Sequence, residues 1–324
     1  MDLHALPRPH SALLVKSIMP RKYFYALLIV MLACGAAVSL GDLDTKVSLD
    51  SAREIWADVL RDVDEFGLHA TRIPAAGEMQ LGAEMAAHIG TWGTEDPEAT
   101  KYVTAVANSL VPHVNRPAIQ YQVHVIQSPE INAFAVPGGH IYVLSGLLDF
   151  LHSEAELASV LGHEISHVDL RHCIERYQYE LALKKVGVGD AGVLVGIAHQ
   201  FASLGYAQYQ ELEADAAGER LAIESDYDPD AAMALFQRMK ARFGETSAAP
   251  ASTPLGEVGQ AVGGALGAYF QTHPPSEERA RQLTAMVARN RSTLRGRAFY
   301  RGVRNFKERV PRTVRRYPGE SRVF

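Results

Sequence analysis

The sequence predicts an α+β fold that is mainly helical, with a small β-sheet next to one long buried helix. Residues 154–173 carry apolar side chains at helical spacing with no proline among them, and residues 206–224 form a second strong helical pattern. Residues 119–127 instead alternate apolar and polar side chains with a period of two, as a half-buried strand does. A chain of 324 residues with 47% hydrophobic content can bury a substantial core around these elements.

The remaining elements follow from the same periodicity, with glycine and proline marking the breaks between them. The expected elements, in chain order, are helices at 52–60, 77–89 and 97–113, strands at 132–136 and 140–144 separated by a Gly138-Gly139 turn, and helices from 228 to about 242 and from 277 to about 289.

The central helix contains an H-E-x-x-H motif, His163-Glu164-Ile165-Ser166-His167. Residues four apart lie on one face of a helix, so His163 and His167 can offer both imidazoles to one cation. Glu164 lies one position round from the pair, where a general base for an attacking water is needed. Ser153, followed three residues later by Glu156, is a capping-box pattern that predicts the start of this helix. The motif therefore indicates a metal site, although so short a pattern also arises by chance.

A third protein ligand must come from elsewhere, because a catalytic zinc ion normally takes three. Two cysteines are too few for a cysteine-rich site. On an ideal helix His172 lies about 140° from His167, so we expect it to point away as a structural histidine. Glu211 and Asp215 lie one turn apart on the helix at 206–224, so one carboxylate can bind metal while the other supports it or donates a proton. A solvated helix face is the alternative interpretation of this pair.

The N-terminal residues 1–41 have the pattern of an export or anchoring segment. A basic start at Arg21 and Lys22 precedes an apolar run at 23–40, which is typical of a secretory signal. The segment around Cys34 resembles a bacterial lipobox, with Cys34 as the acylated residue; an uncleaved membrane anchor and a plain signal peptide are the alternatives. Each of the three interpretations predicts that this segment exports the chain or attaches it to a membrane. Each also places the rest of the chain in the bacterial cell envelope, on the periplasmic side.

The net charge of −5 does not suggest a nucleic-acid partner for the chain as a whole. Charge is uneven, however, because arginines dominate from Arg289 to Arg322 and only Glu308 and Glu320 oppose them. We therefore expect a basic C-terminal extension at 289–324. It is either a solvated, partly disordered tail or a surface for an anionic partner such as lipid headgroups, nucleic acid or an acidic protein.

Four segments in a fixed order carry a resemblance to a known family. They are NAFAVPGGHIYVLSGLL at 132–148, HEISHVDLRH at 163–172, QELEADAAG at 210–218 and THPPSEERA at 272–280. Together they resemble the HtpX/CAAX-prenyl-endopeptidase family of zinc metallopeptidases, over roughly residues 75 to 285. The resemblance implies a gluzincin-like, zincin-like metallopeptidase domain, which we place at 48–288, with one zinc ion per chain.

The resemblance also implies roles for individual residues. On this analogy the zinc ligands are His163, His167 and Glu211, the residue that activates water is Glu164, and the acid partner is Asp215. His273 matches a histidine that acts as a switch or transition-state ligand near the metal in periplasmic members.

The expected function is that of a zinc-dependent endopeptidase acting on misfolded or unassembled envelope proteins. The chain lacks the several long apolar helices of the integral-membrane members, which points to the soluble, envelope-located branch. The strand that contains Asn132, Ala133 and Phe134 either aligns the substrate backbone or is only scaffold. Two alternatives stay open: an envelope chaperone or assembly factor with a closed zinc site in which His273 is a fourth ligand, and a membrane-surface binding module carried by the arginine-rich tail and a lipid on Cys34.

Overall fold

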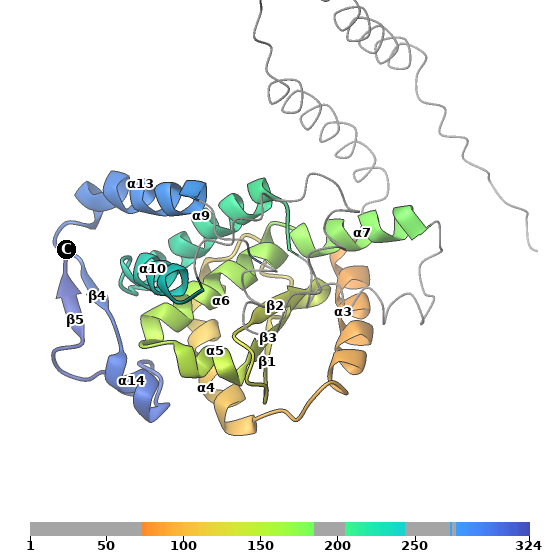
Figure 1. The fold of residues 1–324 in the computed structure, drawn as a ribbon, viewed down its shortest axis with the longest axis horizontal. Coiled ribbons are helices and arrows are strands. Elements are labelled where there is room, and N and C mark those ends of the chain that lie inside the picture. Colours follow the sequence, from red (N-terminus) through yellow and green to blue (C-terminus); the bar gives the residue numbers. More distant parts are fainter. Residues whose placement is uncertain (1–72, 185–204, 244–272, 274–276) are drawn as a thin grey trace, which may run out of the picture. The chain divides into compact units, whose positions relative to one another are not determined.

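A computed structural model describes residues 73–184, 205–243, 273 and 277–324 (Figure 1). The predicted export segment at 1–41 and the helix expected at 52–60 lie outside the described residues. The described part of the chain is mainly helical, which confirms the predicted α+β class. Its helices are α3 (Ala75–Ile89), α4 (Pro97–Leu110), α5 (Ser145–Phe150), α6 (Glu154–Asp169), α7 (His172–Lys184), α9 (Gln208–Glu224), α10 (Ala231–Phe243), α13 (Glu277–Leu294) and α14 (Val303–Glu308). Among them, none combines the length and the apolar character that crossing a membrane requires.

A three-stranded sheet lies against α6. Its strands are β1 (Gln122–Ile126), β2 (Ala133–Val136) and β3 (His140–Leu144), in the order β1-β3-β2. β1 runs parallel to β3, and β2 runs antiparallel to it. The chain crosses from β2 to β3 through Gly138, whose φ of 81° and closeness to α3 both require glycine, because a Cβ there would lie 2.8 Å from the Glu78 carbonyl oxygen.

Helix α6 is the centre of the core, and all of its residues are buried. It starts where the sequence predicts, because the Ser153 side chain accepts a hydrogen bond from the Glu156 N–H at 3.2 Å. The second half of the capping box does not form. The Glu156 carboxylate instead accepts hydrogen bonds from the His152 N–H at 2.7 Å and from the Arg238 guanidinium.

Two glycines let α6 and α9 approach each other closely. A Cβ on Gly162 would lie 2.7 Å from the carbonyl oxygen of Gly218, and a Cβ on Gly218 would lie 2.6 Å from the backbone nitrogen of His163. Any larger side chain at this crossing would push the helices apart. The crossing therefore sets the distance between the motif histidines on α6 and the acidic residues on α9.

The arginine-rich C-terminus is folded, so the expectation of a partly disordered tail is wrong for these residues. β4 (Ala298–Tyr300) and β5 (Ser321–Val323) form a two-stranded antiparallel sheet. The carbonyls of Gly302 and Arg301 accept hydrogen bonds from the first N–H groups of α6, those of Glu154 and Ala155, at 3.1 and 3.0 Å. The C-terminal residues thus cap the helix that carries the H-E-x-x-H motif.

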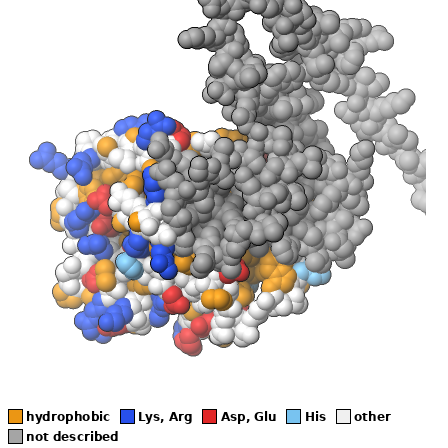
Figure 2. Space-filling view, viewed as in Figure 1, with side chains coloured by type: hydrophobic (Ala, Val, Ile, Leu, Met, Phe, Trp, Pro, Cys, Tyr) orange, Lys and Arg blue, Asp and Glu red, His pale blue; other side chains and the backbone are white. Residues whose placement is uncertain are grey.

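The charge pattern was misleading because it ignored the aromatic side chains between the arginines. Phe299 and Tyr300 are buried, and the Arg312 guanidinium lies 3.7 Å from the ring centroid of Tyr227, where a cation and a π-face attract each other. Lys and Arg side chains still gather on the surface over this part of the molecule (Figure 2). Binding of an anionic partner there stays a prediction.

Candidate metal centre

The two motif histidines and a glutamate from a second helix bring their donor atoms together in the core. The Nε2 atoms of His163 and His167 lie 3.1 Å apart on α6. From α9, Glu211 places Oε2 at 3.5 Å from His163 Nε2 and Oε1 at 3.4 Å from His167 Nε2. Donors bound at about 2.0–2.1 Å to a tetrahedral zinc ion lie about 3.3 Å apart. The structure therefore brings the three predicted ligands together at spacings that fit such an ion.

His273 supplies a fourth donor to this group. Its Nδ1 lies 3.1 Å from His163 Nε2 and 3.0 Å from Glu211 Oε1. One donor atom from each of the four residues lies within 4.8 Å of the others, and all four are buried. The set of three imidazoles and one carboxylate has the donor chemistry that zinc prefers.

The predicted base, Glu164, lies beside this group with no exposed surface. Its Oε1 faces His273 Nε2 at 3.2 Å, and no other described residue donates a hydrogen bond to either oxygen. A buried carboxylate with so few donors is costly unless another ligand, such as water, completes its shell. A carboxylate that lacks hydrogen-bond donors fits a site built to hold a metal ion with a water molecule or a substrate.

Asp215 contacts the ring nitrogen of His163 that does not face the other donors. Its Oδ1 lies 3.0 Å from His163 Nδ1, and both of its oxygens accept hydrogen bonds from the Arg279 guanidinium at 2.7 Å. Burial by itself would raise the pKa of Asp215, but Arg279 and then His163 overcome that effect and hold the pKa below its usual value. An ionised carboxylate with these partners can orient the His163 ring, which is the supporting role that the helix spacing allowed. The role of acid partner, which the family resemblance implies for Asp215, stays a prediction.

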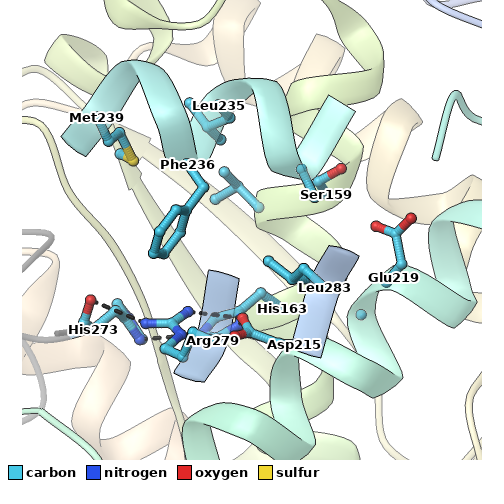
Figure 3. A pocket seen from close by; sticks show the side chains of 13 residues that line it. Ser159, His163, Asp215, Glu219, Leu235, Phe236, Met239, His273, Arg279 and Leu283 are labelled. Carbon is cyan, nitrogen blue, oxygen red and sulfur yellow. Dashed lines mark hydrogen bonds and ion pairs between the residues drawn. The ribbon is translucent and has the colours of Figure 1, made fainter. Parts of the chain in front are cut away.

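Arg279 is the functional residue that the sequence interpretation missed. Besides Asp215, it contacts Glu211 Oε2 at 2.8 Å. It also donates a hydrogen bond to the backbone carbonyl of His273 at 3.1 Å, which Figure 3 shows together with the contacts to Asp215. One buried cation thus ties together two carboxylates from α9 and the segment that carries His273. Its place six residues after that histidine, in THPPSEERA, was the only available signal.

The ionisable groups at the centre shift one another's pKa values. Burial would lower the pKa of His273, but Glu211 and Glu164 outweigh it and raise the pKa to about 10. Burial likewise opposes ionisation of Glu211, yet His273 and Arg279 hold its pKa well below the usual range. Each of these pKa shifts has its cause in neighbours of opposite charge within the same buried group.

Residues 97–287, more than half of the chain, match the family model described as peptidase family M48. The chain belongs to peptidase family M48. This confirms the family resemblance carried by the four ordered segments, and it makes the chain a metallopeptidase.

Several characterised M48 relatives match the same region. Mitochondrial metalloendopeptidase OMA1 of Schizosaccharomyces pombe is 29% identical over 191 residues, which cover 57% of this chain and 52% of that protein. The β-barrel assembly-enhancing protease of Escherichia coli (strain K12) is 31% identical over 206 residues, covering 57% of this chain and 42% of the relative. Metalloprotease LoiP of the same organism is 32% identical over 197 residues, covering 57% and 69%. The chain thus spans about half the length of the first two relatives.

In this M48 domain His172 does not point away from the motif, so that expectation is wrong. Helix α6 ends at Asp169, and Arg171 then adopts a left-handed φ of 72° before His172 starts α7. The predicted direction of the His172 side chain assumed one helix that continued past Asp169, and the structure has no such helix. His172 Nδ1 lies 3.0 Å from His167 Nδ1, and its Nε2 lies 3.2 Å from a carboxylate oxygen of Glu213. His172, paired with Glu213, thus contacts His167 through Nδ1, the ring nitrogen that does not face the other donors. Supporting residues of metal sites hold their ligands in this way.

Tyr206 is a second supporting residue of the M48 site that the sequence did not indicate. Its ring stacks on His167, with ring centroids 3.8 Å apart and planes 16° apart. The Tyr206 hydroxyl lies 3.2 Å from the sulfur of Cys173, which is buried as expected. Stacking on one side and the His172 contact on the other fix the ring of His167.

The strand with Asn132, Ala133 and Phe134 lies next to α6 at an edge of the sheet. The Leu144 N–H donates to the Asn132 carbonyl, so by antiparallel alternation Ala133 directs its backbone N–H and C=O to the outer edge. The side chains of this strand are buried, and Phe134 stacks on Tyr142 with ring centroids 5.0 Å apart. Any substrate contact made by this strand would therefore involve its backbone.

Proposed function

We propose that this chain is a zinc-dependent endopeptidase that cleaves misfolded or unassembled proteins of the bacterial cell envelope. One observation carries the proposal. The donor atoms of His163, His167 and Glu211 converge beside Glu164, whose buried carboxylate accepts few hydrogen bonds from the described residues. Membership of a metallopeptidase family supports the reaction class. The deciding experiment compares cleavage of an unfolded protein by the wild type and by a Glu164→Gln variant, whose expected results are given in the Discussion.

The chain's own residues account for most of the mechanism. A zinc ion held by His163, His167 and Glu211 would polarise the scissile carbonyl and lower the pKa of a bound water toward about 7. Glu164 takes the proton from the attacking water and returns it to the leaving amine. Asp215, held by Arg279, keeps the His163 ring oriented throughout.

Backbone recognition suits substrates without folded structure. An extended segment that paired with the outer edge of β2 would use the N–H and C=O of Ala133, a residue with no exposed surface in this structure, so what covers this edge would have to move aside first. Misfolded or unassembled proteins expose such segments, whereas folded proteins hold theirs in sheets or helices.

His273 lies among the donors that would hold a zinc ion. Three protein ligands plus His273 make a closed set of four, which is the arrangement that a purely structural zinc site also uses. The chaperone alternative rests on this observation. We favour a resting form of the enzyme, because a structural site would leave the carboxylate of Glu164 buried without a task.

Removal of the fourth donor tests this interpretation. A His273→Ala variant is expected to keep its metal, because three ligands remain, and to cleave unfolded casein several-fold faster, on the order of the effect of freeing one coordination position. Initial rates and metal content by inductively coupled plasma mass spectrometry are the measurements. A fall in cleavage with full metal content would instead assign His273 to transition-state binding, and a loss of metal would favour the structural site.

The envelope location rests on the N-terminal sequence and on the relatives. The name of one relative refers to β-barrel assembly in Escherichia coli, whereas another is named mitochondrial. If Cys34 is acylated, the intact mass of protein extracted from membranes will exceed that of the mature polypeptide by a diacylglyceryl group and one acyl chain, and Cys34→Ser will abolish the increment. A mature mass without lipid, or an unprocessed chain, would leave the signal peptide or the uncleaved anchor respectively.

A further inference from the structure

A cavity of about 50 Å³ lies directly beside the predicted metal centre. One side is formed by centre residues His163, Asp215, His273 and Arg279. The remaining wall is mostly apolar and comes from α6, α10 and α13, through the side chains of Val160, Leu235, Phe236, Met239 and Leu283. Figure 3 shows Phe236 and Met239 from α10 above His273, with Glu219 and Ser159 at the other end of the same space. A side chain of a substrate bound at the metal centre could enter this cavity.

The one carboxylate in the apolar part of the cavity wall is that of Glu219 on α9. Only 3% of this residue is exposed, and no described residue hydrogen-bonds either of its carboxylate oxygens. The contrast with Asp215, one turn earlier on the same helix, is direct, because Asp215 is neutralised by Arg279. The fold therefore holds an acidic group in an apolar wall without giving it a cation from the described residues.

The surroundings of Glu219 disfavour its ionised form as long as no cation lies beside it. Burial, followed by the nearby carboxylates of Asp230, Asp228 and Asp215, raises the pKa of Glu219 to about 8. A cation placed against it would relieve both effects, because it would replace lost hydration and offset the neighbouring negative charges.

We infer that this cavity is a specificity subsite in which Glu219 selects a substrate side chain with an apolar stem and a cationic tip, that of lysine or arginine. The inference rests on the proposed cleavage of polypeptides at the adjacent metal centre. The apolar wall matches the methylene stem, and the carboxylate matches the ammonium or guanidinium group. A carboxylate at the end of a side-chain pocket selects basic residues in the same way in trypsin.

Peptide binding tests the subsite without relying on cleavage. The probe is a set of alanine-based octapeptides, each with a single lysine at one position, and a matched set with norleucine in its place. They are titrated calorimetrically into the metal-loaded, full-length Glu164→Gln protein. At one position lysine is expected to bind at least about tenfold more tightly than norleucine, and Glu164→Gln/Glu219→Gln should remove that preference. Equal affinity of the two peptide sets at every position would overturn the inference.

A matched control separates the subsite from a general change in charge. Glu224→Gln makes the same substitution on the same helix, but Glu224 pairs with Arg220 on the surface and does not line the cavity. In the Glu164→Gln background it should leave the lysine preference intact; equal loss in both double variants would refute a local role for Glu219. Melting temperature and metal content verify that each variant is folded and loaded.

Cleavage mapping of casein then distinguishes this inference from the proposed function. Wild-type cuts are expected to show lysine or arginine enriched at one fixed place relative to the scissile bond, and Glu219→Gln should lose that enrichment because it cuts the sites with a basic residue at that place more slowly. Cleavage with no basic preference in the wild type would refute the subsite and leave the peptidase intact. A wild type that binds lysine peptides selectively but cuts nothing would refute the peptidase and leave the subsite.

Discussion

Replacing Glu164 by glutamine is expected to lower cleavage of an unfolded test protein such as casein by about 10²–10⁴-fold. The amide has the shape of the carboxylate and fits the same buried place, but it cannot take a proton from water. Metal content should stay at the wild-type level, because Glu164 is not among the four converging donors. Initial cleavage rates and metal content, measured on the same preparations, are the test.

Two outcomes would contradict this expectation in different ways. Full activity of Glu164→Gln would remove Glu164 as the base. A wild type that holds metal and cuts no more than the variant would favour the chaperone alternative, in which the carboxylate is idle. Glu224→Gln serves as the control for loss of a carboxylate, because this exposed residue lies on α9 away from the converging donors.

Truncation of Glu211 is expected to have the largest effect on metal binding and on folding. Glu211→Ala removes the only carboxylate among the four donors and leaves the buried guanidinium of Arg279 with one partner fewer. Breaking a buried ion pair from one side costs about 3–5 kcal/mol of stability. Metal affinity should fall by more than the roughly 10–100-fold that loss of a supporting residue causes. Chelator competition and thermal unfolding measure the two effects.

His273 can mask part of this loss, because its Nδ1 lies 3.0 Å from Glu211 Oε1 and can remain as a third donor. The double variant Glu211→Ala/His273→Ala is therefore the stringent form of the test. It should bind no metal at micromolar concentrations, while the surface variant Glu224→Ala should match the wild type. Unchanged metal content in the double variant would exclude both residues from the ligand set.

The elements that the sequence predicted well are those whose pattern is set within a single segment. The H-E-x-x-H spacing alone places His163 and His167 on one face and Glu164 beside them, because helical geometry fixes side chains four residues apart. Alternation likewise predicted β1 and β3, and the hydroxyl of Ser153 caps α6 as expected. Four ordered segments sufficed to indicate the family.

The sequence was misleading where a contact crosses from one element to another. His172 was projected round a helix that in fact ends at Asp169, so its contact with His167 depends on the left-handed turn at Arg171. The arginines of the C-terminus were interpreted as solvated charge, whereas aromatic side chains between them are buried and the carbonyls of Arg301 and Gly302 cap α6.

By itself, then, the sequence indicated the family and the fold class and predicted the ligand pair and the base, because each of these follows from spacing along one helix or from the order of segments. Only the tertiary structure decided that Arg279 clamps Asp215 and Glu211, that His273 completes the donor set, and that Glu219 faces an apolar cavity. These residues come together because α6 and α9 cross closely at Gly162 and Gly218 and α10 and α13 pack over the crossing. Packing between elements depends on the whole set of side chains at their interface, and spacing along the chain does not record it.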